Sequence, residues 1–198
     1  MRNPKKILFI VFFFISLFAD ARIYYVSTTG NDANPGTITA PFASWERLSS
    51  VLVAGDIAYI RGGTYHSGKA ENTDAQVRWQ NLNGNATDSI KIFAYPGEYP
   101  IMDLSDVLHT SPAVYGLYLQ NLNYVWIKGL RITGLAQNPS GNVLWGLILV
   151  NSTNCRIEAC EVDNIGGQGY FSYNSNDILY KNCDAHHCDD RYSSGSRT

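Results

Sequence analysis

The sequence predicts an all-β chain that winds into a parallel β-helix, a single-stranded solenoid. Three observations support this fold class. The chain is rich in Gly, Asn, Ser, Thr and aromatic residues, its second half carries a weak internal repeat, and the repeated segments alternate apolar and polar residues. Alternation of this kind is typical of strands with one buried face. A repeat of a few tens of residues is typical of a solenoid, in which each repeat forms one coil.

The repeat becomes visible when Asn121, Asn151 and Asn174 are placed in register, in steps of 30 and 23 residues. Each step then predicts one coil with an asparagine at a corner. Apolar residues coincide at four further positions in the three segments: Val125, Cys155 and Ile178; Ile127, Ile157 and Tyr180; Leu130, Cys160 and Cys183; Ile132, Val162 and Ala185. Residues 57–60 and 90–93 resemble the first of these strands, which places them in two preceding coils.

The two ends of the predicted solenoid differ. Trp45, Leu48 and Leu52 recur at helical spacing after Pro41, so residues 44–52 are expected to form an N-terminal capping helix that covers the first coil. At the other end, residues 191–198 follow an aligned strand without a capping element. We therefore expect the chain to be C-terminally incomplete, with a natural continuation that adds coils.

The first 21 residues have the pattern of a signal peptide. Arg2, Lys5 and Lys6 precede an apolar run over residues 7–19, and Ala19-Asp20-Ala21 is a small-residue cleavage motif. We expect cleavage after Ala21 and a single β-helix domain over residues 22–198. Removal of three basic residues and one acidic residue changes the net charge from −2 to −4. The mature chain is thus expected to be secreted or extracytoplasmic (periplasm, cell surface or extracellular), soluble and monomeric, without affinity for nucleic acid or a membrane.

The N-terminal motifs carry a resemblance to a known family. They are YYVSTTGND over residues 24–32, NPGT over 34–37, PFA over 41–43, GD over 55–56 and RGGTY over 61–65. This opening resembles that of secreted right-handed parallel β-helix polysaccharide lyases, most of all the family nine pectate lyases. Alginate and chondroitin lyases and β-helix proteins of no known activity share it. The resemblance implies a right-handed coil and calcium-dependent β-elimination on an acidic polysaccharide such as pectate.

The resemblance also suggests metal ligands near the end of the chain. Asn182-Cys183-Asp184 and the acidic loop at 186–190 are similar to the region where family nine begins its calcium site, which implies Asp184 as a calcium ligand and, with weaker support, Asp189 and Asp190. A solvated turn is the alternative. The family's remaining carboxylates and its catalytic lysine would lie beyond Thr198, so no catalytic residue is assigned and the chain is expected to be an inactive fragment.

The cysteines raise a separate question. Cys160 and Cys183 occupy the same inward position on adjacent coils, which permits a stacked pair of thiols or an inter-coil disulfide; stacked burial is the preferred interpretation. A zinc site that combines Cys183 and Cys188 with His186 and His187 is disfavoured, because no second ligand pair lies at a recognised spacing.

Exposed aromatic and basic residues complete the set of candidates. Trp126 alternates outward between Val125 and Ile127 and is the best sugar-stacking candidate, ahead of Trp79 and Trp145; ordinary packing is the alternative for all three. We interpret Lys91, Lys128 and Lys181 as a solubilising row on one outer face rather than as catalytic bases. The competing function is a non-catalytic β-helix surface or carbohydrate-binding protein.

Overall fold

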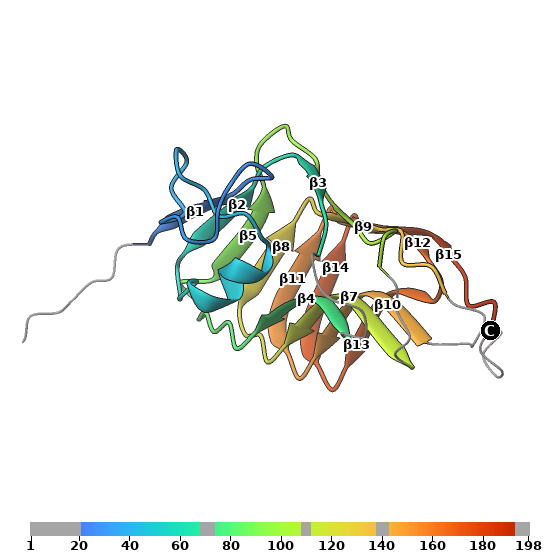
Figure 1. The fold of residues 1–198 in the computed structure, drawn as a ribbon. Helices are drawn as coiled ribbons and strands as arrows, with labels where there is room; N and C mark the ends of the chain where they lie inside the picture. Colours follow the sequence, from blue (N-terminus) through green and yellow to red (C-terminus); the bar gives the residue numbers. More distant parts are fainter. Residues whose placement is uncertain (1–20, 68–73, 108–111, 138–142, 193–198) are drawn as a thin grey trace, which may run out of the picture.

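The chain forms a right-handed parallel β-helix with three faces (Figure 1). The computed structural model describes residues 21–67, 74–107, 112–137 and 143–192. From β2 onward, each coil passes through sheet 1, then sheet 2, then sheet 3. Sheet 1 contains β1 (Ile23–Val26), β2 (Ile57–Ile60), β5 (Ile90–Ala94), β8 (Val125–Lys128), β11 (Thr153–Glu158) and β14 (Asn176–Lys181). Sheet 2 contains β3 (Gly63–Tyr65), β6 (Pro100–Asp103), β9 (Arg131–Thr133), β12 (Glu161–Ile165) and β15 (Asp184–Cys188). Sheet 3 contains β4 (Ala75–Gln80), β7 (Ala113–Gln120), β10 (Val143–Val150) and β13 (Gln168–Tyr173).

The predicted register between coils is confirmed. Ile157 lies opposite both Ile127 and Tyr180, and Val162 lies opposite both Ile132 and Ala185. The two earlier segments also pair in sheet 1, with β2 hydrogen-bonded to β5 and β5 to β8. Because every strand pair is parallel, like positions stack along the helix axis and form rows.

Asparagines form the corner between sheet 3 and sheet 1 in successive coils. Asn81, Asn121, Asn151 and Asn174 all have positive φ, from 47° to 58°. Asn121 Nδ2 donates to Asn81 Oδ1 at 3.0 Å, and Asn174 Nδ2 donates to Asn151 Oδ1 at 2.6 Å. Asparagine tolerates the left-handed backbone better than other residues with a β-carbon, and here its amide also binds the next coil. The sequence repeat thus reflects a backbone requirement.

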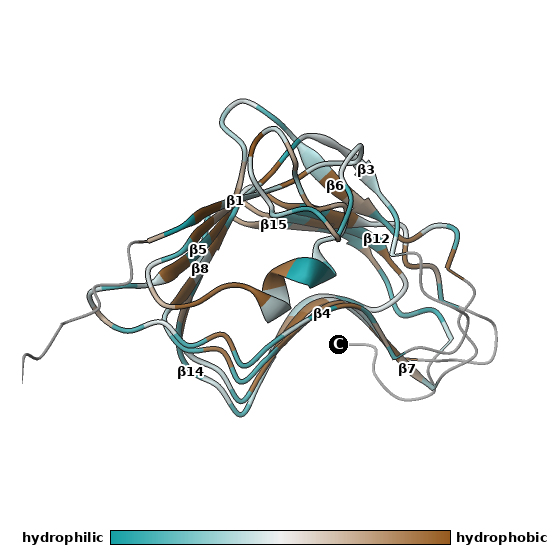
Figure 2. Cartoon of the chain, turned by 60° about the vertical axis from the view of Figure 1, so that its left-hand side comes forward, coloured by the Kyte–Doolittle hydropathy of each residue, from teal (hydrophilic) through white to brown (hydrophobic). Residues whose placement is uncertain are grey.

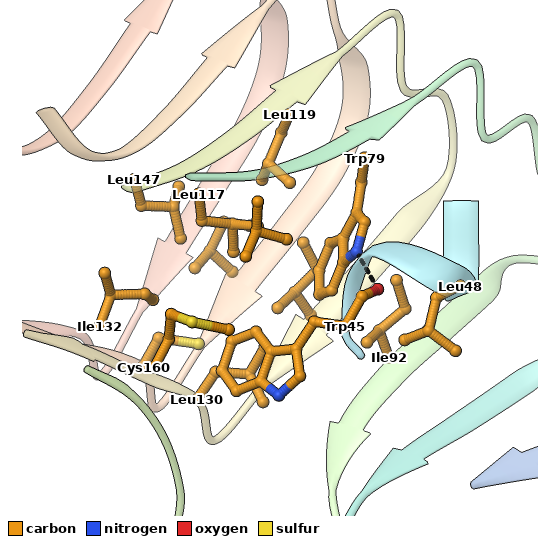
Figure 3. Close-up of a cluster of buried hydrophobic side chains, with 14 of the residues drawn as sticks. Trp45, Leu48, Trp79, Ile92, Leu117, Leu119, Leu130, Ile132, Leu147 and Cys160 are labelled. Carbon is orange, nitrogen blue, oxygen red and sulfur yellow. Dashed lines mark hydrogen bonds between the residues drawn. The ribbon is translucent and has the colours of Figure 1, made fainter. Parts of the chain in front are cut away.

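The core is a stack of aliphatic rows closed by aromatic residues near the N-terminus (Figure 3). Trp79 is fully buried, and its Nε1 donates to the carbonyl of Trp45 at 2.7 Å. The suggestion that Trp79 stacks on sugars is therefore wrong.

The core is thin at Gly146, where an added β-carbon would come within 2.2 Å of Val162 Cγ1. Glycine lets sheet 3 approach the opposite wall at this level.

The N-terminal segment differs from the predicted helix over residues 44–52. It forms a short 3₁₀ helix, Glu46–Ser50. The next residue, Val51, has a φ of −123° and leaves the helical conformation. Trp45, Leu48 and Leu52 are nonetheless buried, and the Gln80 N–H donates to Ser49 Oγ at 2.9 Å. Figure 2 shows the helix within the outline of the coils. Spacing of apolar residues identified the buried side chains but could not distinguish one 3₁₀ turn from a longer α-helix, because both bring residues three positions apart onto one side. The capping role stays a prediction.

Replacement of Asn151 tests the corner row. Asn151→Ala removes the hydrogen bond to Asn174 and puts an alanine at φ 51°, so we expect a loss of about 2 kcal/mol in the free energy of unfolding. Asn151→Gly removes the same bond without the backbone strain and should cost about half as much. Urea unfolding measures both. Equal losses for the two variants would contradict the backbone role of this row.

Candidate functional site

The outer face of sheet 2 gathers polar side chains at its C-terminal end, on β9, β12 and β15. The inward residues of these strands are apolar, so the alternating positions point away from the core. Two outward rows result from the register. One contains Arg131, Glu161 and Asp184, and the other contains Thr133, Asp163 and His186. These rows bring together groups that lie more than fifty residues apart in the chain.

An ion pair between coils forms the centre of this polar face. Arg131 Nε lies 2.8 Å from Asp163 Oδ1, and its Nη2 donates to Oδ2 at 2.9 Å. Thr133 Oγ1 donates to the same carboxylate at 3.0 Å, and only 1% of the Asp163 side chain is exposed. Burial raises the pKa of Asp163, but the hydrogen bonds from Arg131 and Thr133 outweigh it, so the pKa lies below the ordinary aspartate value. Asp163 therefore stays ionised.

Glu161 and His186 extend the cluster toward the last described coil. Glu161 Oε1 lies 3.1 Å from His186 Nε2 and 3.4 Å from Arg131 Nε. One potential ligand atom from each of Glu161, Asp163 and His186 lies within 4.8 Å of the others. Because the Asp163 carboxylate already accepts bonds from Arg131 and Thr133, a metal ion at this point would compete with a bound guanidinium.

The three aspartates proposed as calcium ligands do not form one group. Asp184 is exposed at the start of β15, opposite Glu161, and within the described ranges no side chain hydrogen-bonds to its carboxylate. Asp189 and Asp190 follow the end of β15, about 16 Å further along an extended chain. Asp189 lies 3.0 Å from Arg191 Nε, and Asp190 accepts a hydrogen bond from Gln137 Nε2 at 2.7 Å.

A hollow of about 550 Å³ lies beside Asp189, between the end of β15 and the preceding coil. Gln137, Asn164, His187 and Tyr192 contribute to its lining. Asp184 does not line it. Asp184 and Glu161 thus lie opposite each other on sheet 2, and neither lines the hollow that Asp189 borders.

Sequence reasoning missed Glu161, Asp163 and Arg131. The signal was available, since Val162 was aligned with Ile132 and Ala185 as an inward residue. Its neighbours Glu161 and Asp163 must then point outward, into the rows that contain Asp184 and His186.

Two carboxylates on sheet 2 are far from enough for a complete calcium site. Calcium takes about six to eight oxygen ligands, and Asp184 and Glu161 offer two carboxylates between them. Arg131 lies within 3.4 Å of Glu161 and weakens the attraction for a cation. The described residues fit calcium only if further oxygens, from water, substrate or other residues, complete the shell.

All four cysteines are free thiols in the structure. Burial raises the pKa of Cys160 to about 12, and the adjacent Cys183 adds to this effect. The Tyr170 hydroxyl donates to the Cys160 carbonyl at 2.8 Å, which covers this part of the core. The thiol of Cys160 is therefore protonated at neutral pH and unsuited to act as a zinc ligand without a large rearrangement.

The candidate tryptophans and lysines lie on other faces. Trp126 points outward from sheet 1, and Trp145 on sheet 3 stacks against Tyr115 with ring centroids 5.1 Å apart. The lysines do not form one row, because Lys91 lies opposite Trp126 whereas Lys128 and Lys181 both lie opposite Glu158. The sequence alignment started at Asn121 and so gave no register for Lys91.

The Arg131–Asp163 pair should stabilise the fold in a pH-dependent way. Because the pKa of Asp163 is depressed in the folded state, its contribution is present above the unfolded pKa of about 4 and is lost as the pH falls through the folded value. Asp163→Asn should lower the free energy of unfolding by about 2 kcal/mol at pH 7, since Arg131 is left without its partner. The difference from wild type should shrink in acid. Urea unfolding at several pH values measures it; a difference that does not change with pH would contradict this account.

Comparisons with known proteins agree with this geometry. The sequence profile of the family described as "Pel9A-like, right handed beta helix region" matches residues 24–198. Pectate lyase PEL9 from Emericella nidulans (strain FGSC A4) is 34% identical over 97 residues, which is 49% of this chain and 22% of the fungal protein. This chain therefore spans about a fifth of the curated relative's length.

Solved structures share the fold at low sequence identity. A rhamnogalacturonan lyase superposes with a TM-score of 0.60 at 18% identity, over 87% of this chain and 60% of that chain. The GH136 lacto-N-biosidase from Eubacterium ramulus gives 0.61 at 17% identity, over 84% of this chain and 34% of that chain. The names of these two proteins describe different activities, so the likeness concerns the fold. The family match, which covers nearly the whole described chain, decides the classification: the chain belongs to the Pel9A-like right-handed β-helix family.

Proposed function

We propose that this chain is part of a secreted polysaccharide lyase that cleaves an acidic polysaccharide such as pectate by calcium-dependent β-elimination. The family match over residues 24–198 carries the proposal. The name of one relative, the pectate lyase that is 34% identical over 97 residues, supports the substrate class. The exposed carboxylate of Asp184 and the half-buried one of Glu161 beside it support a cation-dependent reaction.

The chemistry needs a base that removes the proton at C5 of a uronate while the glycosidic oxygen leaves from C4. Calcium, when bound, neutralises the substrate carboxylate and makes that proton more acidic. Asp184 and Glu161 would hold the cation together with further oxygens, and Arg131 and Thr133 keep Asp163 ionised behind them. Among the described residues the lysines, Lys91, Lys128 and Lys181, all belong to sheet 1. In the part of the chain that the structure describes, no ion pair joins any of them to Asp184 or Glu161; Lys128, for example, pairs with Glu158 instead. We therefore propose that the chain alone is inactive.

A non-catalytic saccharide-binding protein is the second candidate. The incomplete set of cation ligands on sheet 2 favours it. Binding without release of an unsaturated product would distinguish it from a lyase.

Export is part of the proposal. The expected signal peptide falls on residues 1–20, outside the described residues, and on Ala21. Among the residues that the structure describes, no helix is long and apolar enough to cross a membrane. The backbone N–H of Arg22 donates to Asp56 Oδ1 at 2.8 Å, and Asp56 is only 1% exposed. Cleavage after Ala21 would turn this nitrogen into an ammonium group beside a buried carboxylate, which supports that cleavage position.

The new N-terminus should therefore stabilise the processed chain through Asp56. We expect Asp56→Asn to lower the melting temperature of residues 22–198 more than that of a chain that keeps Ala21, because only the first has an ammonium group at Arg22. Differential scanning fluorimetry compares the four proteins at pH 7. Mass spectrometry of the exported product gives the cleavage position. Equal effects of the substitution in both backgrounds, or a first residue other than Arg22, would contradict the assignment.

Activity tests Asp184 directly. A longer protein that continues past Thr198 should release an unsaturated, ultraviolet-absorbing product from polygalacturonate when calcium is present, whereas residues 22–198 alone should release none. In the longer protein, Asp184→Asn should lower the rate at limiting calcium at least tenfold, because a cation ligand is lost.

Asp177→Asn is the matched control for the charge change. It lies on sheet 1, and its positive φ of 54° suits asparagine. We expect it to keep the wild-type rate. Absence of product from the longer protein at every calcium concentration would exclude the lyase, and a wild-type rate for Asp184→Asn would exclude only Asp184 as a ligand.

A further inference from the structure

The outer face of sheet 1 has an aromatic groove near its corner with sheet 2. The hollow has a volume of about 460 Å³, within the range of small-molecule sites. We call this hollow the sheet 1 groove. Its lining includes Tyr59, Phe93, Tyr95, Trp126 and Lys128. All five side chains are at least partly exposed, although three of them are large aromatic residues on strands. Half-exposed aromatic residues gathered in a hollow are typical of binding sites.

The rings of the groove are held in place by neighbours. Phe93 and Trp126 meet edge to face with centroids 4.9 Å apart, and Tyr59 meets Tyr95 edge to face at 5.8 Å. The Arg61 guanidinium lies 4.6 Å from the centre of the Tyr95 ring and donates to both carboxylate oxygens of Glu98 at 2.7 to 3.0 Å. A ligand would therefore meet a preformed surface and lose little free energy to ordering of side chains.

Two lysine–aromatic pairs join adjacent coils at the groove, one of them through Lys91, which lies beside the lining rather than in it. Lys91 lies opposite Trp126, and Phe93 lies opposite Lys128. The Lys128 side chain is 47% exposed, and its ion pair with Glu158 Oε1 is long, at 3.7 Å. Phe93 thus has a lysine opposite it on the next coil, whereas Trp126 has Lys91 on the preceding coil and the Arg156 guanidinium 4.3 Å from its ring centre on the next. Rings suit the apolar faces of pyranoses, and ammonium groups suit carboxylates.

The charge of this face is opposite to that of the whole chain. The outward positions of β5, β8 and β11, the strands at and beside the groove, carry three basic residues (Lys91, Lys128 and Arg156) and one acidic residue (Glu158). The chain as a whole has a net charge of −2. A local excess of positive charge on an acidic protein attracts a polyanion to that face.

We propose that the sheet 1 groove binds a uronic-acid polysaccharide independently of calcium, as a holding site on a different face from the carboxylates of sheet 2. The rings of Phe93 and Trp126 take sugar rings. Lys128 takes a uronate carboxylate in the groove, and Lys91, opposite Trp126 beside the groove, takes a second one. The choice of an acidic saccharide rests on the proposed function, whereas the groove itself rests on geometry and charge. A neutral glycan or a protein partner would not need the two lysines.

Binding of an oligogalacturonate to residues 22–198 in EDTA tests the proposal by isothermal titration calorimetry. We expect measurable affinity that falls as salt is added, at least tenfold weaker binding for Trp126→Ala and about threefold weaker binding for Lys128→Gln. Matched controls outside the groove are Tyr173→Ala and Lys181→Gln, which should bind within twofold of wild type. A neutral oligosaccharide of the same length should bind at least tenfold more weakly.

Thermal unfolding separates lost binding from lost structure. If Trp126→Ala lowers the melting temperature, its weaker binding is not interpreted, and the affinity of Lys128→Gln, a substitution on the surface, tests the proposal instead. The absence of wild-type binding in EDTA, equal binding of the neutral oligosaccharide, or equal affinities of Lys128→Gln and Lys181→Gln would overturn the proposal. Retained groove binding in a longer protein without lyase activity would exclude only the lyase, and lyase activity with no binding in EDTA would exclude only the groove.

Discussion

Hydrogen bonding between successive coils is the interaction on which the rest of the molecule depends. Each strand pairs in parallel with the corresponding strand of the next coil. Asparagines hold the register at the corner, where the backbone has positive φ. Once the register is set, side chains at equivalent positions form rows. Inward rows make the core, and outward rows decide what each face can bind.

The outward rows give two neighbouring faces opposite chemistry. Sheet 2 places Glu161 and Asp184 side by side, with Arg131 bound to the buried Asp163. Sheet 1 places Phe93 of one coil opposite Lys128 of the next, at a preformed aromatic hollow. Neither arrangement exists within one stretch of sequence, since every member of a row comes from a different coil. A solenoid can therefore change its ligand by substitutions at surface positions while its core stays constant.

The parts of the fold that the sequence predicts are those that repeat. Asn151 and Asn174 recur because the corner backbone requires them, so the register of the last three coils follows from the alignment. Trp79 and Asp163 were not predicted as buried, because each owes its burial to residues from other coils: Trp79 binds the Trp45 carbonyl, and Asp163 binds Arg131. No local pattern encodes such contacts.

Single-copy elements were also harder to predict than repeated ones. The segment after Pro41 has the apolar spacing of a helix but forms only one short 3₁₀ turn, because packing against β4 rather than intrinsic propensity determines its length. The position of Lys91 was wrong because the alignment did not extend to its coil. Outward alternation around Val162 could have identified Glu161, yet the family resemblance directed attention to Asp184.

The register between coils is the central claim, and scalar couplings across hydrogen bonds measure it in solution. In deuterated protein of residues 22–198, the amide of Asp184 should couple to the carbonyl of Cys160, and the amide of Glu161 to the carbonyl of Leu130. These two couplings place Glu161 between Arg131 and Asp184 on the outer face. Couplings to carbonyls one or two residues away would contradict the account, because the rows on both faces would then contain other side chains.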